Sequence, residues 1–93
     1  VFYKMKHEET FQKARKLIDE RELDDANLDT AYDLLEAAVE EDETCDWAYG
    51  LISEIYYWTG EYAGADDKMF NYEQGVEWGE KVVAVNENSL EAN

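Results

Sequence analysis

The side chains most often used in catalysis are scarce in this 93-residue chain. His7 is the only histidine and Cys45 the only cysteine, and no histidine stands near Cys45 in the sequence to activate its thiol. Carboxylates are abundant, with 24 Asp and Glu residues, so no two of them stand out as a paired acid and base. The residue types therefore predict that the chain is not an enzyme. A lone Cys45 forms no internal disulfide and is expected to be a small packing residue.

Two acidic stretches resemble calcium ligands only loosely. They are Asp24, Asp25, Asn27 and Asp29, followed later by Asp66 and Asp67. A calcium-binding EF-hand loop needs a fixed spacing with a central glycine and a final glutamate, and neither stretch has it. Gly75 and Gly79 follow no strand and form no phosphate-binding loop. We therefore predict no metal site and no cofactor.

The charge of the chain excludes some classes of partner. The sequence has 8 Lys and Arg against 24 Asp and Glu, a net charge of −16. Residues 1–21 hold six of the basic residues and four acids, whereas residues 22–93 hold two lysines and twenty acids. Binding to nucleic acid needs clustered Lys and Arg, so no nucleic-acid partner is predicted. No apolar run is long enough to span a membrane, so we predict no direct membrane insertion by these residues.

Helical spacing of apolar residues runs through most of the chain and predicts an all-α fold. A first helix is predicted over 8–22, where Phe11, Ala14, Leu17 and Ile18 form one stripe, and a second over 30–41. A third is expected to begin after an N-cap at Thr44 and to end at Gly60 with a left-handed cap. A fourth is expected to begin at Asn71 with a capping box and to end near Val85.

The second and fourth helices align with each other at an offset of 44 residues. Ala31 then falls on Gly75, Leu35 on Gly79 and Ala38 on Val82. An offset of 44 residues equals a repeat of about 34 residues plus about ten more. The segment 61–71 offers an obvious place for such an insertion, and we predict a loop there. The chain is thus predicted to contain two helical repeats.

The segment 49–62, YGLISEIYYWTGEY, resembles the first helix of a tetratricopeptide repeat. Tyr49 stands where the family has Trp, Ile52 and Ser53 where it has Leu and Gly, and Tyr56 where it has Tyr. Gly60 and Glu61 match the turn, and the family's small residues fall at Ala31, Ala38 and Gly75. The family's closing proline is replaced by Glu43 and Glu87, Val82 replaces an alanine, and the helix over 8–22 matches poorly.

The resemblance implies one domain over 1–93, a fragment of an α-α superhelix with four helices. It contains two antiparallel helix-turn-helix repeats, at about 8–43 and about 44–88, the second with the loop insertion at about 61–71. In this family the first helix of each repeat lines a concave surface that binds partners. Carried over to this chain, five residues face that groove: Trp47, Gly50, Glu54, Tyr57 and Trp58. Tyr49, Ile52 and Tyr56 belong to the core. We also place Lys16, on the first helix, among the partner-binding residues.

Neighbouring residues on a helix point about 100° apart, so Tyr57 and Trp58 cannot both be buried on the stripe that buries Tyr56. Either some aromatic surface is left for a partner, or the rings pack under the 61–71 loop. An exposed aromatic surface beside carboxylates suits a peptide that is apolar or basic.

Two functions remain open after this reading. The first is a scaffold or adaptor that binds a protein or peptide partner without catalysis. The second is self-assembly into a homo-oligomer, because two repeats are fewer than the three or so that an independent solenoid usually needs. The chain begins VFYKMK without an initiator Met, so we expect a fragment of a longer protein. A weaker similarity to bacterial envelope lipoproteins with such repeats favours a periplasmic or membrane-anchored location, with the cytoplasm as the alternative.

Overall fold

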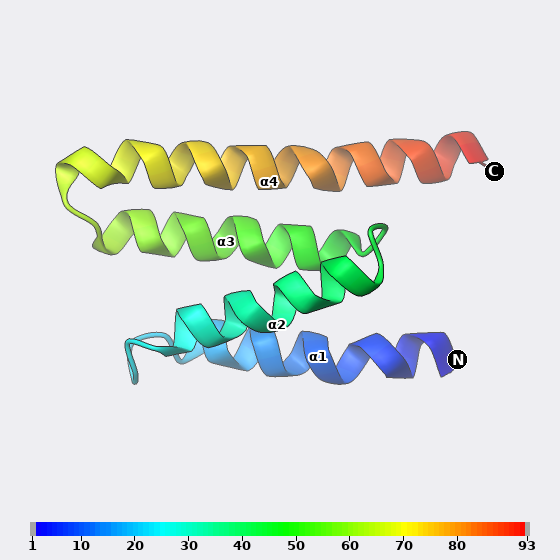
Figure 1. The fold of residues 1–93 in the computed structure, drawn as a ribbon, viewed down its shortest axis with the longest axis horizontal. Coiled ribbons are helices and arrows are strands. Elements are labelled where there is room, and N and C mark those ends of the chain that lie inside the picture. The colour runs from blue at the N-terminus through cyan, green and yellow to red at the C-terminus, as the bar shows by residue number, and fades with distance from the viewer. Residues whose placement is uncertain (1, 93) are drawn as a thin grey trace.

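Four helices make up the protein, and the prediction of an all-α fold is confirmed. The computed structural model describes the backbone of residues 2–92 and the side chains of residues 8–64 and 66–87. The helices are α1 (Phe2–Asp19), α2 (Asn27–Glu41), α3 (Asp46–Tyr62) and α4 (Ala65–Ala92). Each helix runs antiparallel to the one before it, so α1 and α3 point the same way (Figure 1). Over the part of the chain described, no strand is present.

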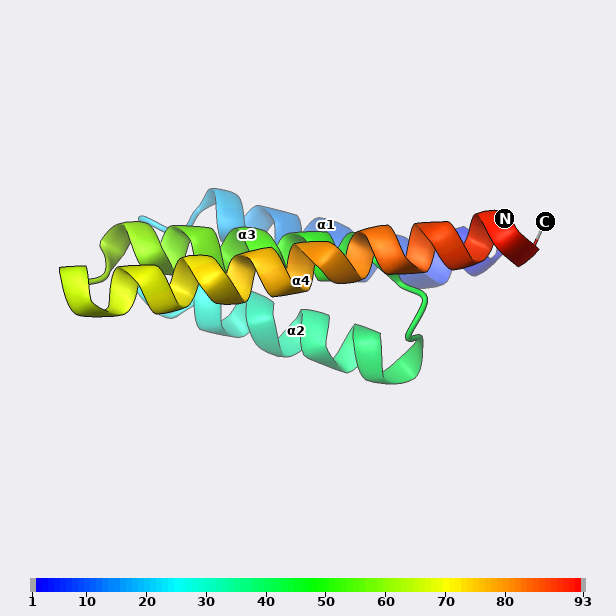
Figure 2. The ribbon, with the colours of Figure 1, turned by 90° about the horizontal axis from the view of Figure 1, so that it is seen from above.

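Helix α3 lies at the centre of the molecule. It contacts α4 most extensively, and also α2 and α1, whereas α4 touches no other described helix than α3. Figure 1 shows α3 between α4 on one side and the contacting helices α1 and α2 on the other. Seen from above in Figure 2, α1 and α2 are displaced to either side of the line along which α4 runs over α3. Helix α4 has 28 residues, which corresponds to about 42 Å of helix. The molecule is accordingly elongated, with extents of 44 × 25 × 17 Å.

The hydrophobic core lies between α1, α2 and α3. Ile18, Leu35 and Ile52, one from each of these helices, are the largest fully buried side chains. Other buried residues surround them: Ala14, Ala31, Ala38, Cys45, Ala48, Leu51 and Ile55. Burying one large aliphatic side chain stabilises a fold by about 1.5–3 kcal/mol relative to leaving it exposed. The core therefore depends on three helices meeting, and α4 joins it mainly through its contact with α3.

The predicted loop at 61–71 is wrong. Helix α3 continues to Tyr62 and α4 begins at Ala65, so only residues 63 and 64 lie between the two helices. The sequence here contains no proline, and Asp66 and Asp67 occupy the first turn of α4, where negative charge favours a helix N-terminus. The extra residues of the 44-residue offset are therefore accommodated as additional helical turns.

Several predicted helix ends are also wrong, and α4 continues past the predicted end near Val85 to Ala92. Thr44 does not cap α3, because its own N–H and hydroxyl both donate to the Asp42 carboxylate, at 2.9 and 2.6 Å. Gly60 is helical and has no positive φ. A Cβ on Gly60 would lie 2.8 Å from the Tyr72 ring, so close packing explains the glycine. Asn71 lies inside α4, where its amide donates to the Asp67 carbonyl at 2.9 Å. At Thr44 and Asn71 a hydrogen bond to a residue two or four positions earlier replaces the predicted cap, and at Gly60 a contact with another helix explains the glycine.

Candidate functional site

Four aromatic rings form a continuous row on the C-terminal half of α3 and the facing part of α4. Tyr72 stacks on Tyr57, with 5.9 Å between ring centroids. Tyr57 meets Trp58 edge to face at 5.2 Å, and Trp58 stacks on Tyr62 at 6.4 Å. Tyr57 and Tyr62 keep 46% and 56% of their surface exposed. The row therefore presents aromatic surface to solvent mainly at Tyr57 and Tyr62, while Trp58 and Tyr72 are half-buried.

The guanidinium of Arg21, just after α1, lies over this row. Its Cζ is 3.5 Å from the centroid of the Trp58 ring, and its Nη1 donates to the Ile18 carbonyl at 3.0 Å. A cation over an indole face is attracted by the ring quadrupole, by about 0.5–1 kcal/mol at an exposed site and more when desolvated. This contact joins the end of α1 to α3 across 37 positions of sequence and holds the connection between α1 and α2 against the aromatic row.

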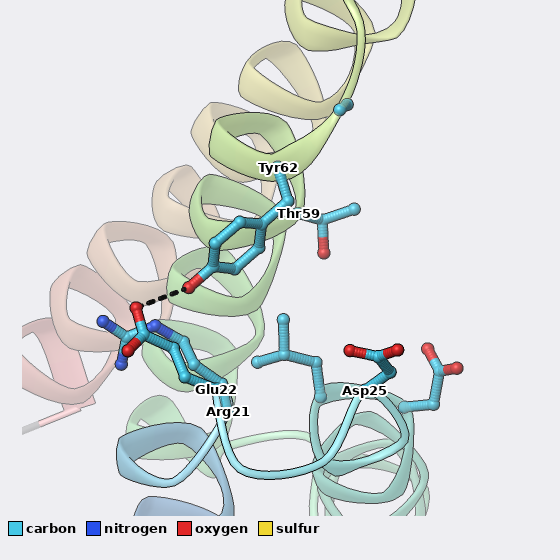
Figure 3. Close-up of a pocket in the computed structure, with 8 residues that line it drawn as sticks. Arg21, Glu22, Asp25, Thr59 and Tyr62 are labelled. Carbon is cyan, nitrogen blue, oxygen red and sulfur yellow. Dashed lines mark hydrogen bonds between the residues drawn. The ribbon is translucent and has the colours of Figure 1, made fainter.

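A hollow of about 550 Å³ opens beside Tyr62. Tyr62 and Thr59 reach it from α3, while Arg21, Glu22 and Asp25 reach it from the connection between α1 and α2 (Figure 3). Leu28, Asp29 and Ala63 complete its lining. The Tyr62 hydroxyl lies 3.5 Å from a Glu22 carboxylate oxygen, the one hydrogen bond drawn between the lining residues. The hollow thus combines a tyrosine ring with carboxylates from a separate segment.

The electrostatics of the hollow are negative. Three carboxylates line it, from Glu22, Asp25 and Asp29, against the single guanidinium of Arg21. That guanidinium is already engaged with Trp58 and with the Ile18 carbonyl. All three acids are exposed, so they keep their hydration while the hollow is open. A cationic group entering the hollow would find both opposite charge and an aromatic face.

The other end of the row is held by a hydrogen bond between α4 and α3. The Tyr72 hydroxyl donates to the Glu61 carboxylate at 2.6 Å. The bond raises the pKa of Tyr72 to about 12, because ionising the phenol would place two negative charges together, and it lowers the pKa of Glu61. The hydrogen bond thus fixes the Tyr72 ring at the end of the row, where it stacks on Tyr57.

The predicted groove residues Trp47 and Glu54 lie on the face of α3 that meets α1. Trp47 is half-buried and meets Phe11 edge to face at 5.5 Å. Glu54 accepts two hydrogen bonds from the Arg15 guanidinium, and this ion pair raises the pKa of Arg15. Both residues make contacts within the molecule that join α1 to α3. The Gly50 position beside them is exposed.

The structure brings the predicted residues Tyr57 and Trp58 together but keeps Lys16 apart from them. Tyr57 and Trp58 are adjacent members of the aromatic row. Tyr57 does not pack under a loop, since the ring that covers one of its faces is Tyr72 of α4. Lys16 is exposed on α1 and lines a separate shallow hollow with Phe11 and Arg15.

Several residues of the site were missed in the sequence. They are Arg21, Glu22, Asp25, Asp29, Tyr62 and Tyr72. Asp25 and Asp29 had drawn attention only as loose calcium ligands. Arg21 is one of just eight basic residues in an acidic chain, and this rarity was the one available signal that it has a specific partner.

Metal and thiol chemistry find little support in the geometry. Among the side chains that the structure describes, no three His, Cys, Asp or Glu residues come together as metal ligands. Cys45 is buried, which raises the pKa of its thiol to about 11 and leaves little reactive thiolate at pH 7. The His7 side chain lies outside the described residues. Within the described range, no helix is both long enough and apolar enough to cross a membrane.

Comparisons of this chain with protein-family models, with curated proteins and with solved structures give no match.

Proposed function

We propose that this chain is a non-enzymatic protein-binding module that takes a peptide segment carrying a basic side chain next to an apolar one. The observation that supports this most is the hollow beside Tyr62, where an exposed aromatic ring and three carboxylates meet. A lysine or arginine would place its charged head among Glu22, Asp25 and Asp29. Its aliphatic stem, or the neighbouring apolar residue, would lie on Tyr62 and Leu28.

The rest of the aromatic row extends this surface toward Tyr57. Aromatic residues concentrate binding energy in protein interfaces, and truncating such an anchor typically costs about 2 kcal/mol or more. The net charge of −16 also favours a cationic partner, since it speeds the encounter with a positive surface. The proposed family, the tetratricopeptide repeats, uses surfaces of its helices in the same general way. No catalytic role is proposed.

A fragment of the expected ligand tests this function directly. Acetyl-arginine amide, titrated into isotope-labelled protein, should shift the backbone NMR signals of Asp25, Thr59 and Tyr62 in a saturable way. The double variant Asp25→Asn, Asp29→Asn should weaken this binding at least about fivefold, because it removes charge at the hollow. Both residues are exposed, so the fold should persist.

A charge-matched variant provides the control. Asp33→Asn with Glu40→Gln also removes two negative charges, but from exposed positions of α2 that do not line the hollow. This variant should bind acetyl-arginine amide nearly as well as the unmodified protein. Equal weakening by the two double variants would mean that overall charge alone attracts the fragment, and the proposal would then fail.

Self-assembly is the second candidate, and one observation favours it. Met69, Val76 and Val83 of α4 are more than half exposed, which leaves apolar surface without a neighbour in the part of the molecule described. The net charge of −16 on every copy opposes such association. Sedimentation over a range of protein concentrations, at low and at moderate salt, decides whether copies associate.

A further inference from the structure

The outer face of α4 carries a straight line of apolar residues. Met69, Val76 and Val83 follow each other at intervals of seven and are 64%, 61% and 55% exposed. Tyr72 and Gly79 lie between them, at the three-residue step of the same pattern. A seven-residue interval with this intermediate step keeps side chains on one side of a helix and is the spacing by which helices pack together. The line runs from residue 69 to residue 83, a rise of about 21 Å along the helix.

Two hollows adjoin each other along this line. One has a volume of about 450 Å³ and is lined by Ser53, Tyr57, Tyr72, Gly75, Val76 and Gly79. The other has a volume of about 390 Å³ and is lined by Met69, Tyr72, Glu73, Val76 and Glu77. They share Tyr72 and Val76, so together they form one groove, called here the α4 groove.

Small residues line the α4 groove where α3 and α4 meet, and they leave it deep. The Ser53 hydroxyl donates to the Gly75 carbonyl at 2.6 Å, which draws α3 and α4 close together. A Cβ added at Gly79 would meet only the Ser53 hydroxyl, at 3.6 Å. The backbone of α4 is therefore open to a close approach from outside, which a helix with bulky side chains can fill.

The molecule itself shows what covers the corresponding face of its first helix pair. At the offset of 44 residues, Tyr32 and Val39 of α2 correspond to Val76 and Val83 of α4. Tyr32 and Val39 are partly buried against the core, and Tyr32 meets Tyr56 of α3 edge to face at 6.0 Å. A helix is thus the element that covers this face of α1 and α2, whereas α4 touches no other described helix than α3.

Charge distinguishes between the helices that could occupy the α4 groove. Glu73 and Glu77 line the groove, and Glu80 lies one turn further along α4, all three exposed. A second copy would bring another net charge of −16 to this acidic rim. We propose that the α4 groove binds an amphipathic helix of a partner protein, with large apolar residues on one face and lysine or arginine flanking them. This surface is separate from the hollow beside Tyr62.

A synthetic helix of leucine and lysine tests this proposal. The probe is a peptide of about 18 residues, about 27 Å when helical, with leucines on one face. A scrambled peptide of the same composition has the same charge but no apolar face. We expect the amphipathic peptide to bind at least about tenfold more tightly than the scrambled one, as measured by fluorescence anisotropy.

Val76→Asp should then weaken binding of the amphipathic peptide at least about tenfold. This variant makes the protein more negative, so a merely electrostatic attraction would grow stronger. Leu23→Asp is the matched control, because Leu23 is 79% exposed between α1 and α2, outside the α4 groove. Val83→Asp provides a second variant on the line, and circular dichroism checks that each variant retains its helix content.

Each outcome has a defined meaning. Equal binding of the scrambled peptide, or no loss with both Val76→Asp and Val83→Asp in folded protein, overturns the proposal. If the protein alone forms a dimer and Val76→Asp dissociates that dimer, the groove binds a second copy, and this result also overturns the proposal. The Asp25→Asn, Asp29→Asn variant should still bind the amphipathic peptide, and Val76→Asp should still bind acetyl-arginine amide. These two measurements distinguish failure of the proposal for the α4 groove from failure of the proposed function of the hollow beside Tyr62.

Discussion

The two helix pairs of this molecule differ in what covers them. The pair α1 and α2 contributes Ile18 and Leu35 to a core that α3 completes, and both side chains are fully buried. The pair α3 and α4 carries apolar residues of similar size on α4, such as Val76 and Val83, yet more than half of each is exposed. The difference shows that an apolar residue stabilises the fold only where a neighbouring helix covers it. On the last helix, the same kind of residue remains available for binding.

The pairs also differ in the use of charge. The basic residues near the N-terminus meet α3 at specific places, with Arg15 on Glu54 and Arg21 over Trp58. On α4, Lys81 lies 5.1 Å from the centroid of the Trp78 ring of its own helix, and the acids Glu73 and Glu77 face outward. Two arginines of the first pair thus find partners on α3, whereas the acids Glu73 and Glu77 leave negative charge at the surface of α4.

The largest expected effect contrasts one apolar residue from each pair. Leu35→Ala should lower the free energy of unfolding by about 2–5 kcal/mol, because it leaves a cavity at a completely buried site. Val76→Ala should change it by less than about 0.5 kcal/mol, because the side chain is already 61% exposed. Urea denaturation followed by circular dichroism measures both. If the two variants lost similar amounts of unfolding free energy, the apolar face of α4 would have to be covered in solution.

Glycine substitutions on α4 are expected to change the free energy of unfolding by up to about 1 kcal/mol. Gly79→Ala should stabilise the protein by up to about 1 kcal/mol, because alanine favours a helix interior and the new Cβ makes only an ordinary contact at 3.6 Å. Gly75→Ala should gain less or lose stability, since its Cβ would lie 3.3 Å from the Ser53 carbonyl oxygen. The same denaturation experiment gives the order, and a larger gain for Gly75→Ala would show that α3 and α4 are not held closely there.

The ion pair between α1 and α3 should have a smaller effect. The side chains of Arg15 and Glu54 are 33% and 35% exposed, so water screens their attraction. A double-mutant cycle with Arg15→Ala and Glu54→Ala should give a coupling free energy of about 0.5 kcal/mol that falls as salt is added. Arg15 also pairs with Asp19, at 2.9 Å, and Asp19→Ala serves as the control within α1. A coupling above about 2 kcal/mol would contradict this expectation.

The smallest effect is expected at the hydrogen bond between Tyr72 and Glu61. Folding raises the pKa of Tyr72 from its ordinary value of 10 to about 12, so the stability from this bond is complete below pH 10 and is lost as the pH rises toward 12. The lowered pKa of Glu61 keeps its carboxylate ionised at neutral pH. The tyrosinate absorbance of the protein minus that of Tyr72→Phe isolates this titration. A midpoint near pH 10 in the folded protein would contradict the bond.

Much of the fold could be predicted because it depends on helical periodicity. The helical spacing of Ala31, Leu34, Leu35, Ala38 and Val39 predicted the second helix, in which Ala31, Leu35 and Ala38 are buried and Leu34 and Val39 are half-buried. The 100° step between neighbours predicted that Tyr57 and Trp58 could not both be buried with Tyr56, and Tyr57 is exposed while Trp58 is half-buried. These properties are local to one helix, so the sequence pattern alone determines them.

The end of α3 and much of the site could not be predicted because they depend on distant contacts. Gly60 matched a helix end, but the Tyr72 ring packs against it and the helix continues to Tyr62. The position of Arg21 over Trp58 requires α1 and α3 to lie side by side with a particular offset. No pattern within a single helix specifies that offset, and the hollow beside Tyr62 exists only because of it.

The three tryptophans occupy three different contacts between parts of the molecule. Trp47 meets Phe11 where α1 joins α3, Trp58 lies under Arg21 beside the connection to α2, and Trp78 of α4 lies 5.9 Å from Tyr49 of α3. Intrinsic fluorescence therefore reports on each contact separately once two of the three are replaced by phenylalanine. Such single-tryptophan proteins would follow the loosening of each contact in time, and would show whether α4 separates from α3 before the three-helix core opens.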